Sequence, residues 1–127
     1  MKLELKGLVD WGGIIGQSAF DPTNCSVRLW VDIGVEDEVG ANQFDLQVVT
    51  PTFLNSCGKA IWGKSLLVVP VFTWENVERE IEELKLIAGV PAQNWEEAVK
   101  MLTRFMRWEY EGMEGSDKTV LIPFPGQ

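Results

Sequence analysis

The chain has 127 residues, 46% of them hydrophobic, so it is long enough to close a hydrophobic core without disulfides or metals. Its 11 basic and 19 acidic residues give a net charge of −8, which disfavours nucleic acid and anionic membranes as partners and favours a basic protein. The alternative from charge alone is that the acidic balance serves only solubility. The longest apolar run, residues 66–72, is too short to span a membrane, and no secretory signal is visible, so we expect one cytoplasmic domain over residues 1–127.

Alternation of apolar and polar residues predicts strands in the first half of the chain. Residues 3–8 alternate with a slip in register near Gly7, and residues 10–24 are rich in turn-forming residues that predict a long loop. Residues 25–34 alternate cleanly, so one face of this strand is expected in the core. The other face carries one ring and two charges: Arg28, Trp30 and Asp32.

A second alternating segment follows an acidic turn. Residues 35–42 form that turn and residues 43–50 the next strand, which predicts an antiparallel pair. Thr50 is placed to cap one short helical turn, because a proline follows it at the first helical position. Residues 65–72 predict a buried strand that Pro70 ends or restricts to an edge of the sheet.

From Thr73 onward the apolar residues recur every three or four positions, which predicts two helices. Thr73 is the expected N-cap of the first helix and Gly89 its C-terminal stop. The second helix is expected to begin after Asn94, which has capping-box spacing to Glu97, and to reach about Glu111. These elements predict an α+β fold: an antiparallel sheet of about four to five strands with both C-terminal helices packed on one face. Residues 113–127 are expected to be a tail or an edge strand.

The composition excludes most kinds of catalytic site. The chain contains no histidine, which excludes the Ser-His-Asp and Cys-His arrangements and nearly all catalytic zinc sites. It contains no phosphate-binding glycine motif, and Cys25 and Cys57 are too few and too far apart for a disulfide scaffold or a zinc site. We therefore expect no cofactor, no metal and no enzymatic activity.

The carboxylates concentrate in two places that lack neighbouring bases. No lysine or arginine occurs in residues 30–57, which hold five acids. Rings and acids then alternate in residues 108–111. Aromatic rings beside acids are typical of an interface for a basic protein, although both rings could instead simply close the core. The candidate interface residues are Glu36, Asp37, Glu38, Asp45, Trp108, Glu109, Tyr110 and Glu111.

Two other functions remain open from the residues alone. A carboxylate-dependent hydrolase would need two acids facing each other across a cleft. Its candidates are Asp32, Asp45, Glu109 and Glu111. A scaffold that forms homodimers through its tryptophans is the third reading.

Two sets of short motifs follow one another along the chain. The first is a Phe-Asp strand leading into Thr-Pro and an aromatic-Leu turn: Phe44, Asp45, Thr50, Pro51, Phe53 and Leu54. The second is a closing Trp-x-Glu and Trp-Glu-aromatic-Glu pattern: Trp95, Glu97, Trp108, Glu109, Tyr110 and Glu111. Their order resembles a known family, the immunity protein 8 family of bacterial polymorphic toxin and contact-dependent inhibition systems. The resemblance covers roughly residues 2–112 and is strongest after Ala41. The chain departs from the family at Thr52-Phe53, where Lys-Trp is more common, and at Gly112, where an acid is frequent.

This resemblance implies a small cytoplasmic antitoxin that binds the C-terminal domain of a toxin encoded beside it. Many such toxins are nucleases with basic clefts, which an acidic protein can occupy. The resemblance thus implies a protein partner. Together with the net charge, we expect no nucleic acid and no membrane as partners, and a monomer or weak homodimer. Under this hypothesis Glu109 and Glu111 are surface recognition groups.

Overall fold

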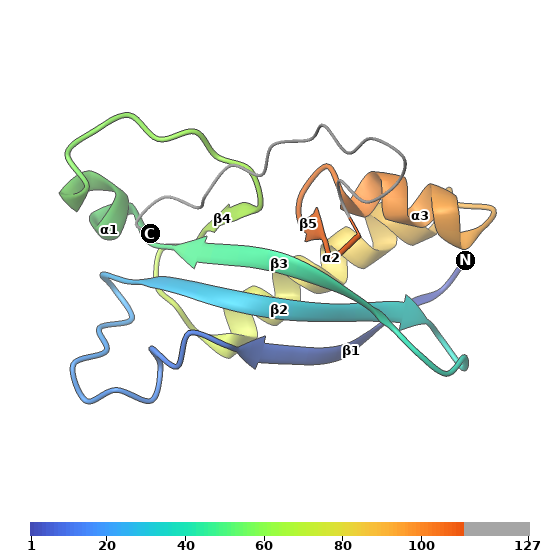
Figure 1. Ribbon diagram of the computed structural model, residues 1–127, viewed down its shortest axis with the longest axis horizontal. Helices are drawn as coiled ribbons and strands as arrows, with labels where there is room; N and C mark the ends of the chain where they lie inside the picture. The colour runs from blue at the N-terminus through green and yellow to red at the C-terminus, as the bar shows by residue number, and fades with distance from the viewer. Residues whose placement is uncertain (111–127) are drawn as a thin grey trace.

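The computed structural model describes residues 1–110. Glu111 and the segment expected as a tail or an edge strand, residues 113–127, lie outside the described residues. Within residues 1–110, five strands and three helices follow one another (Figure 1). They are β1 (Leu3–Asp10), β2 (Ser26–Val35), β3 (Asn42–Val49), α1 (Pro51–Ser56), β4 (Leu66–Val68), α2 (Trp74–Gly89), α3 (Trp95–Leu102) and β5 (Arg107–Trp108).

The strands form one mixed sheet in the order β1-β2-β3-β4. The antiparallel pairs β1–β2 and β2–β3 confirm the prediction, and the expected slip in β1 is a register shift between Leu5 and Gly7. The remaining edge of β3 is shared, since β4 pairs with its last three residues and β5 with Phe44 and Asp45. An antiparallel sheet was expected, but β4 runs parallel to β3, so the sheet is mixed. The reason is the connector at residues 57–65, which carries the chain back along β3 before β4 begins (Figure 1).

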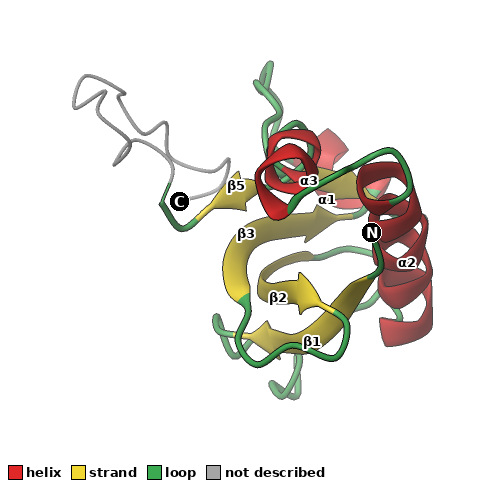
Figure 2. Cartoon of the chain, turned by 90° about the vertical axis from the view of Figure 1, so that its right-hand side faces the viewer, coloured by secondary structure: helices red, strands yellow, loops and turns green. Residues whose placement is uncertain are grey.

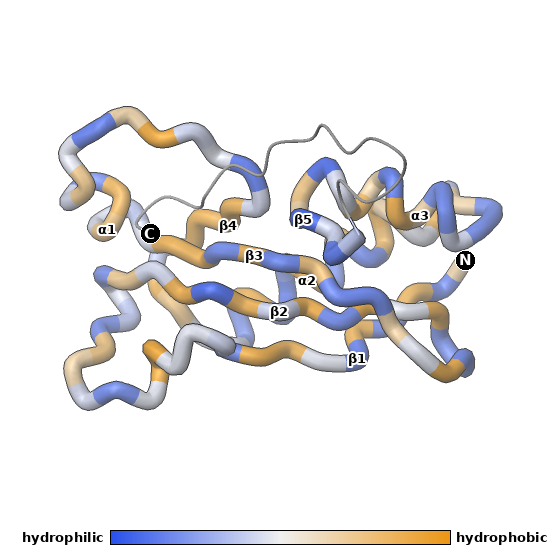
Figure 3. Tube along the Cα trace, viewed as in Figure 1, coloured by the Kyte–Doolittle hydropathy of each residue, from blue (hydrophilic) through white to orange (hydrophobic). Residues whose placement is uncertain are grey.

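The core lies between the sheet and the helices α2 and α3, which cover the same side of it (Figure 2). Apolar and polar residues alternate along β2 and β3 (Figure 3), because one face of each strand meets the helices and the other does not. The strand residues that are fully excluded from solvent are Val27, Leu29, Val31, Ile33, Phe44, Val48 and Val49. The α+β prediction, with two C-terminal helices on one face, is therefore confirmed.

All three predicted helix caps are present. The side-chain oxygen of Thr50 accepts a hydrogen bond from the Phe53 N–H at 3.4 Å, and that of Thr73 accepts from the Asn76 N–H at 3.0 Å. Asn94 accepts from the Glu97 N–H at 2.9 Å. Each bond satisfies an amide that the first helical turn would otherwise leave without an acceptor.

Gly89 ends α2 for a reason other than the one expected. It is the last helical residue, and its φ is not positive, so it is not a left-handed cap. A Cβ at this position would lie 2.6 Å from the carbonyl oxygen of Met1. Glycine is therefore required here because the N-terminal residues pass directly over the end of the helix.

The second C-terminal helix is shorter than predicted. α3 ends at Leu102 and not near Glu111, and a tight turn then leads into β5. Met106 is buried and keeps the apolar period of the helix, so the pattern alone could not show the end. The backbone of Arg107 and Trp108 pairs with β3 instead of continuing the helix. No helix within residues 1–110 is long and apolar enough to cross a membrane.

Candidate functional site

The first acidic cluster lies at the tip of the β2–β3 hairpin. We call Glu36, Asp37 and Glu38 the hairpin tip. Asp37 has a φ of 68°, a left-handed conformation that Asp tolerates better than most residues. Gly34 lies below the tip, and a Cβ there would be 2.5 Å from the Gly40 carbonyl oxygen. The two arms therefore approach so closely that only glycine fits at this position, which fixes how the tip projects.

Basic residues pair with only part of the negative charge of the hairpin tip. The Lys2 ammonium lies 3.7 Å from a Glu36 carboxylate oxygen, and both side chains are exposed. An exposed pair of this kind contributes little to stability. Lys6 donates to the backbone carbonyl of Glu38 and so does not neutralise its carboxylate directly. The hairpin tip thus keeps a concentrated negative charge in solvent.

Glu109 has a structural role that the sequence did not reveal. Its Oε1 accepts hydrogen bonds from the Gln43 backbone N–H at 2.8 Å and from Asn42 Nδ2 at 3.4 Å. Its own N–H donates to the Gln43 carbonyl at 2.9 Å. Asn42 in turn accepts from Trp95 Nε1 at 2.8 Å. Glu109 therefore ties the residues after β5 to the start of β3, beside the base of the hairpin.

Replacing Glu109 tests this role. We expect Glu109→Ala to lower the free energy of unfolding by about 1 kcal/mol, because a charged acceptor for a backbone amide is lost. Glu109→Gln keeps an acceptor oxygen and is expected to lose less than half as much. Urea unfolding followed by circular dichroism measures both variants. Equal losses in the two variants would mean that the hydrogen bonds of Glu109 do not hold this segment.

The two rings near the end of the described chain divide their roles. Trp108 is half-buried and pairs with Phe44 on the core face, whereas Tyr110 is 45% exposed. One ring therefore packs on the sheet and the other lies at the rim. The rings also touch edge to face, with centroids 5.1 Å apart. In a helix, rings two residues apart would lie on different faces, and the contact forms here because the chain leaves β5 in a turn at Glu109 and Tyr110.

Asp45 lies on the opposite face of the sheet, away from the helices. It pairs with Trp30 of β2 on one side and with Arg107 of β5 on the other. Burial raises the pKa of the Asp45 carboxyl above its usual 3.8, although the cations of Arg107 and Arg28 lower it. The structure therefore does not bring Asp45 together with the exposed acids of the hairpin tip. Its carboxylate belongs to a partly buried group of mixed charge.

A tryptophan cluster on the same face was not predicted. Trp11 stacks on Trp30 with ring centroids 5.7 Å apart, and the guanidinium of Arg28 lies 4.4 Å from the Trp11 ring centroid. Trp30 was expected on this face, but Trp11 comes from the long loop, where no period predicts its direction. Asp10 orients that loop, because its carboxylate accepts from the N–H groups of Gly13 and Ile15.

The described residues offer little to metal or redox chemistry. Among residues 1–110, no three His, Cys, Asp or Glu side chains are arranged to hold a metal ion. Cys25 and Cys57 are free, and burial raises the pKa of the Cys25 thiol, which makes it less nucleophilic. What these residues do provide is an exposed acidic tip, an exposed ring at Tyr110, and the hydrogen bonds of Glu109 to the base of the hairpin.

Comparison with known proteins agrees with the motif pattern. The family model described as Immunity protein 8 matches residues 8–113. This range contains every candidate interface residue named above. No curated protein and no solved structure matches the chain.

Proposed function

Because the chain belongs to the immunity protein 8 family, toxin neutralisation is its expected activity, and we propose that it occludes a basic toxin domain with an acidic, ring-bearing surface. The family match over residues 8–113 is the observation that carries this proposal. Immunity proteins are typically non-enzymatic, which agrees with the prediction that this chain is not an enzyme. The partner is thus a protein, and the effect is produced by binding alone.

The charge of the chain supports a nuclease as the toxin. A nuclease must hold phosphates, so its cleft is basic and attracts an acidic protein. A net charge of −8 favours encounter with such a cleft. Complementary charge accelerates association, while a few aromatic side chains that lose their water on binding slow dissociation. We propose that the toxin is a nuclease, delivered by secretion or by cell contact, and that its C-terminal domain is the part bound.

The proposed contact surface combines the hairpin tip with Tyr110. The tip supplies exposed carboxylates, and Tyr110 supplies an exposed ring supported edge-on by Trp108. Glu109 contributes through its bridge to the base of the hairpin, which holds Tyr110 in place. Asp45 contributes negative charge from the opposite face of the same strands.

The hydrolase alternative receives less support from the geometry. Asp45 is partly buried, and its carboxylate interacts with the cations of Arg107 and Arg28 as well as with Glu109. Glu109 is committed to hydrogen bonds with Asn42 and Gln43. An acid of a glycosidase pair must instead face its partner across the substrate. The family assignment and this placement both favour a binding protein.

Co-expression tests the proposal directly. The toxin domain encoded immediately upstream of this gene is induced in cells that do or do not produce the full chain. We expect growth only when the chain is present, and a complex of the two purified proteins in a stable 1:1 peak. An unrelated acidic protein of similar net charge is the control, and protection by that protein would show that charge alone suffices. Failure of the chain to bind or protect would refute the proposal.

A further inference from the structure

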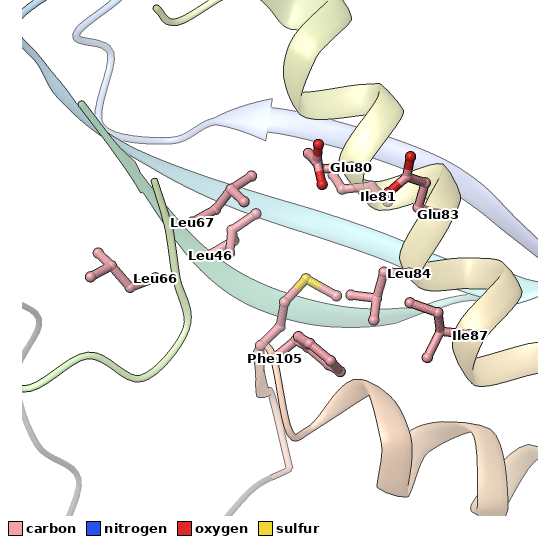
Figure 4. A pocket seen from close by; sticks show the side chains of 10 residues that line it. Leu46, Leu66, Leu67, Glu80, Ile81, Glu83, Leu84, Ile87 and Phe105 are labelled. Atoms are coloured by element: carbon pink, nitrogen blue, oxygen red, sulfur yellow. The ribbon is translucent and has the colours of Figure 1, made fainter. Parts of the chain in front are cut away.

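An apolar groove lies between α2, β4 and the turn that follows α3 (Figure 4). Its volume is about 220 Å³. Side chains from the sheet form one wall and side chains from α2 the other, with Phe105 at one end (Figure 4). The apolar lining residues are Leu46, Leu66, Leu67, Ile81, Leu84, Ile87, Phe105 and Met106. For comparison, an apolar cavity of about 150 Å³ is large enough to bind benzene.

The groove is open because two apolar side chains do not reach the core. Ile87 belongs to the apolar stripe of α2, yet it is 52% exposed, whereas Leu84 and Ala88 on either side of it are buried. Phe105 follows the end of α3 and is 47% exposed. Had α3 continued as a regular helix, Phe105 would have remained on its apolar stripe. The early end of α3 therefore leaves large apolar side chains facing solvent beside a concave surface.

The rim of the groove carries negative charge. Glu80 and Glu83 line it, both exposed, and no lysine or arginine is among its lining residues. Of the two bases on α2, Arg79 donates to Asn76 at 2.6 Å and Lys85 bonds to Glu82 at 2.6 Å. At 100° per residue, Glu82 and Lys85 lie on the flank of α2 away from the groove. The groove thus combines an apolar floor with an acidic edge.

We propose that this groove receives an apolar side chain that the toxin presents between basic residues. The proposal rests on the proposed function, because the occupant is the same toxin. Glu80 and Glu83 complement flanking lysines or arginines, while Ile87 and Phe105 lose water against the inserted side chain. Phe105 and Tyr110 belong to one short stretch of chain, so a single partner can contact both. The groove then acts as the anchor pocket, and the hairpin tip guides the encounter.

Two pairs of variants of the full chain test the groove against the upstream-encoded toxin. Ile87→Asp places a charge in the groove, and its matched control is Leu86→Asp, an exposed residue on the same helix that does not line the groove. We expect Ile87→Asp to weaken toxin affinity about tenfold or more, as loss of an interface anchor does. Leu86→Asp is expected to change affinity by less than about twofold. Calorimetric titration gives both values, and equal affinities in the two variants would overturn the proposal.

The second pair tests the acidic rim with two double variants that have the same net charge as each other. Glu80→Lys with Glu83→Lys reverses the rim, and Glu75→Lys with Glu78→Lys reverses two exposed acids of the same helix that do not line the groove. The rim variant is expected to lose about tenfold in affinity and the control much less. Equal losses in the two variants would remove the rim from the interface. If the wild type still bound the toxin in that case, the proposed function would remain supported.

A peptide probe tests the groove without any toxin. The acetylated, amidated peptide Lys-Lys-Leu-Phe-Lys-Lys is added to the isotopically labelled full chain, with Glu-Glu-Leu-Phe-Glu-Glu as control. We expect the basic peptide alone to shift the methyl resonances of Ile81, Leu84 and Ile87. Absence of these shifts would overturn the proposal even if the toxin binds elsewhere. If the same resonances shift instead on dilution, the occupant of the groove is a second copy of the chain. If they shift in the variant Ile122→Asp, the occupant is the chain's own C-terminal segment. Either result would also overturn it.

Discussion

Reversing the charge of the hairpin tip is expected to slow association with the toxin by about 10-fold to 100-fold at low ionic strength. The variant combines Glu36→Lys, Asp37→Asn and Glu38→Lys. Asparagine is chosen at the second position because φ there is 68°, and Asn tolerates the left-handed region where Lys would be strained. The dissociation rate should change much less, because the exposed carboxylates act mainly before the partners are in contact. Stopped-flow mixing with the upstream-encoded toxin measures both rates.

The salt dependence and a matched control make this test specific. Raising the ionic strength should slow the wild type far more than the variant, because salt screens exposed charges beyond roughly 10 Å at 0.1 M. The control, Glu75→Lys, Glu78→Gln and Glu82→Lys, changes the net charge by the same amount on the outer flank of α2. If the control slows association as much as the hairpin variant, the hairpin tip has no special part in the encounter. Such a result would reduce the role of charge to the net charge of the molecule.

Replacing Phe44 with alanine is expected to lower the free energy of unfolding by about 3–5 kcal/mol. Phe44 is fully buried and pairs with Val31 of β2 on one side and with Trp108 of β5 on the other. Deleting its ring removes apolar contacts and leaves a cavity at the junction of three strands. Since small domains have only about 5–15 kcal/mol of stability, this loss should also reduce the folded fraction in the cell. Thermal and urea unfolding measure it.

Two further variants serve as controls for Phe44→Ala. Phe44→Leu retains most of the volume and is expected to lose less than about 1.5 kcal/mol, so it remains measurable if the alanine variant does not fold. Val39→Ala removes an apolar group from a fully exposed position and should change stability by less than about 0.5 kcal/mol. A loss below about 1 kcal/mol in Phe44→Ala would contradict the buried junction described above.

Local signals predicted the parts of the fold that depend on a few neighbouring residues. Thr50, Thr73 and Asn94 were identified as caps because a side-chain oxygen before a helix has one dominant use. The β2–β3 hairpin was identified because period-two alternation on both sides of a polar turn has few other readings. The slip near Gly7 was visible for the same reason, as a break in that alternation.

The missed features depend on contacts between distant parts of the chain. The direction of β4 follows from the path of the connector before it, which its own apolar run does not encode. The end of α3 is set by pairing of Arg107 and Trp108 with β3, whereas Met106 keeps the helical period. Tertiary pairing outweighs the local pattern at such positions.

The candidate site was predictable in its charge and not in its geometry. The hairpin tip is exposed as its composition suggested, because acids in a turn have no buried alternative. Glu109 was given a recognition role, but a carboxylate reaching a backbone amide 66 residues away leaves no trace in the local sequence. The sequence did not predict the groove, because Ile87 fits the apolar stripe of α2 and its position in the pattern is that of a core residue. In the structure Ile87 lies outside the core and lines the groove.

The brevity of β4 bears on how the protein behaves when it accumulates. An exposed edge strand is a template on which another chain can add. β4 has only three residues, and Pro70, which has no N–H to donate, follows almost at once. A neighbouring molecule therefore finds at β4 too short a ladder to extend, so this edge of the sheet does not promote edge-to-edge aggregation at high protein concentration.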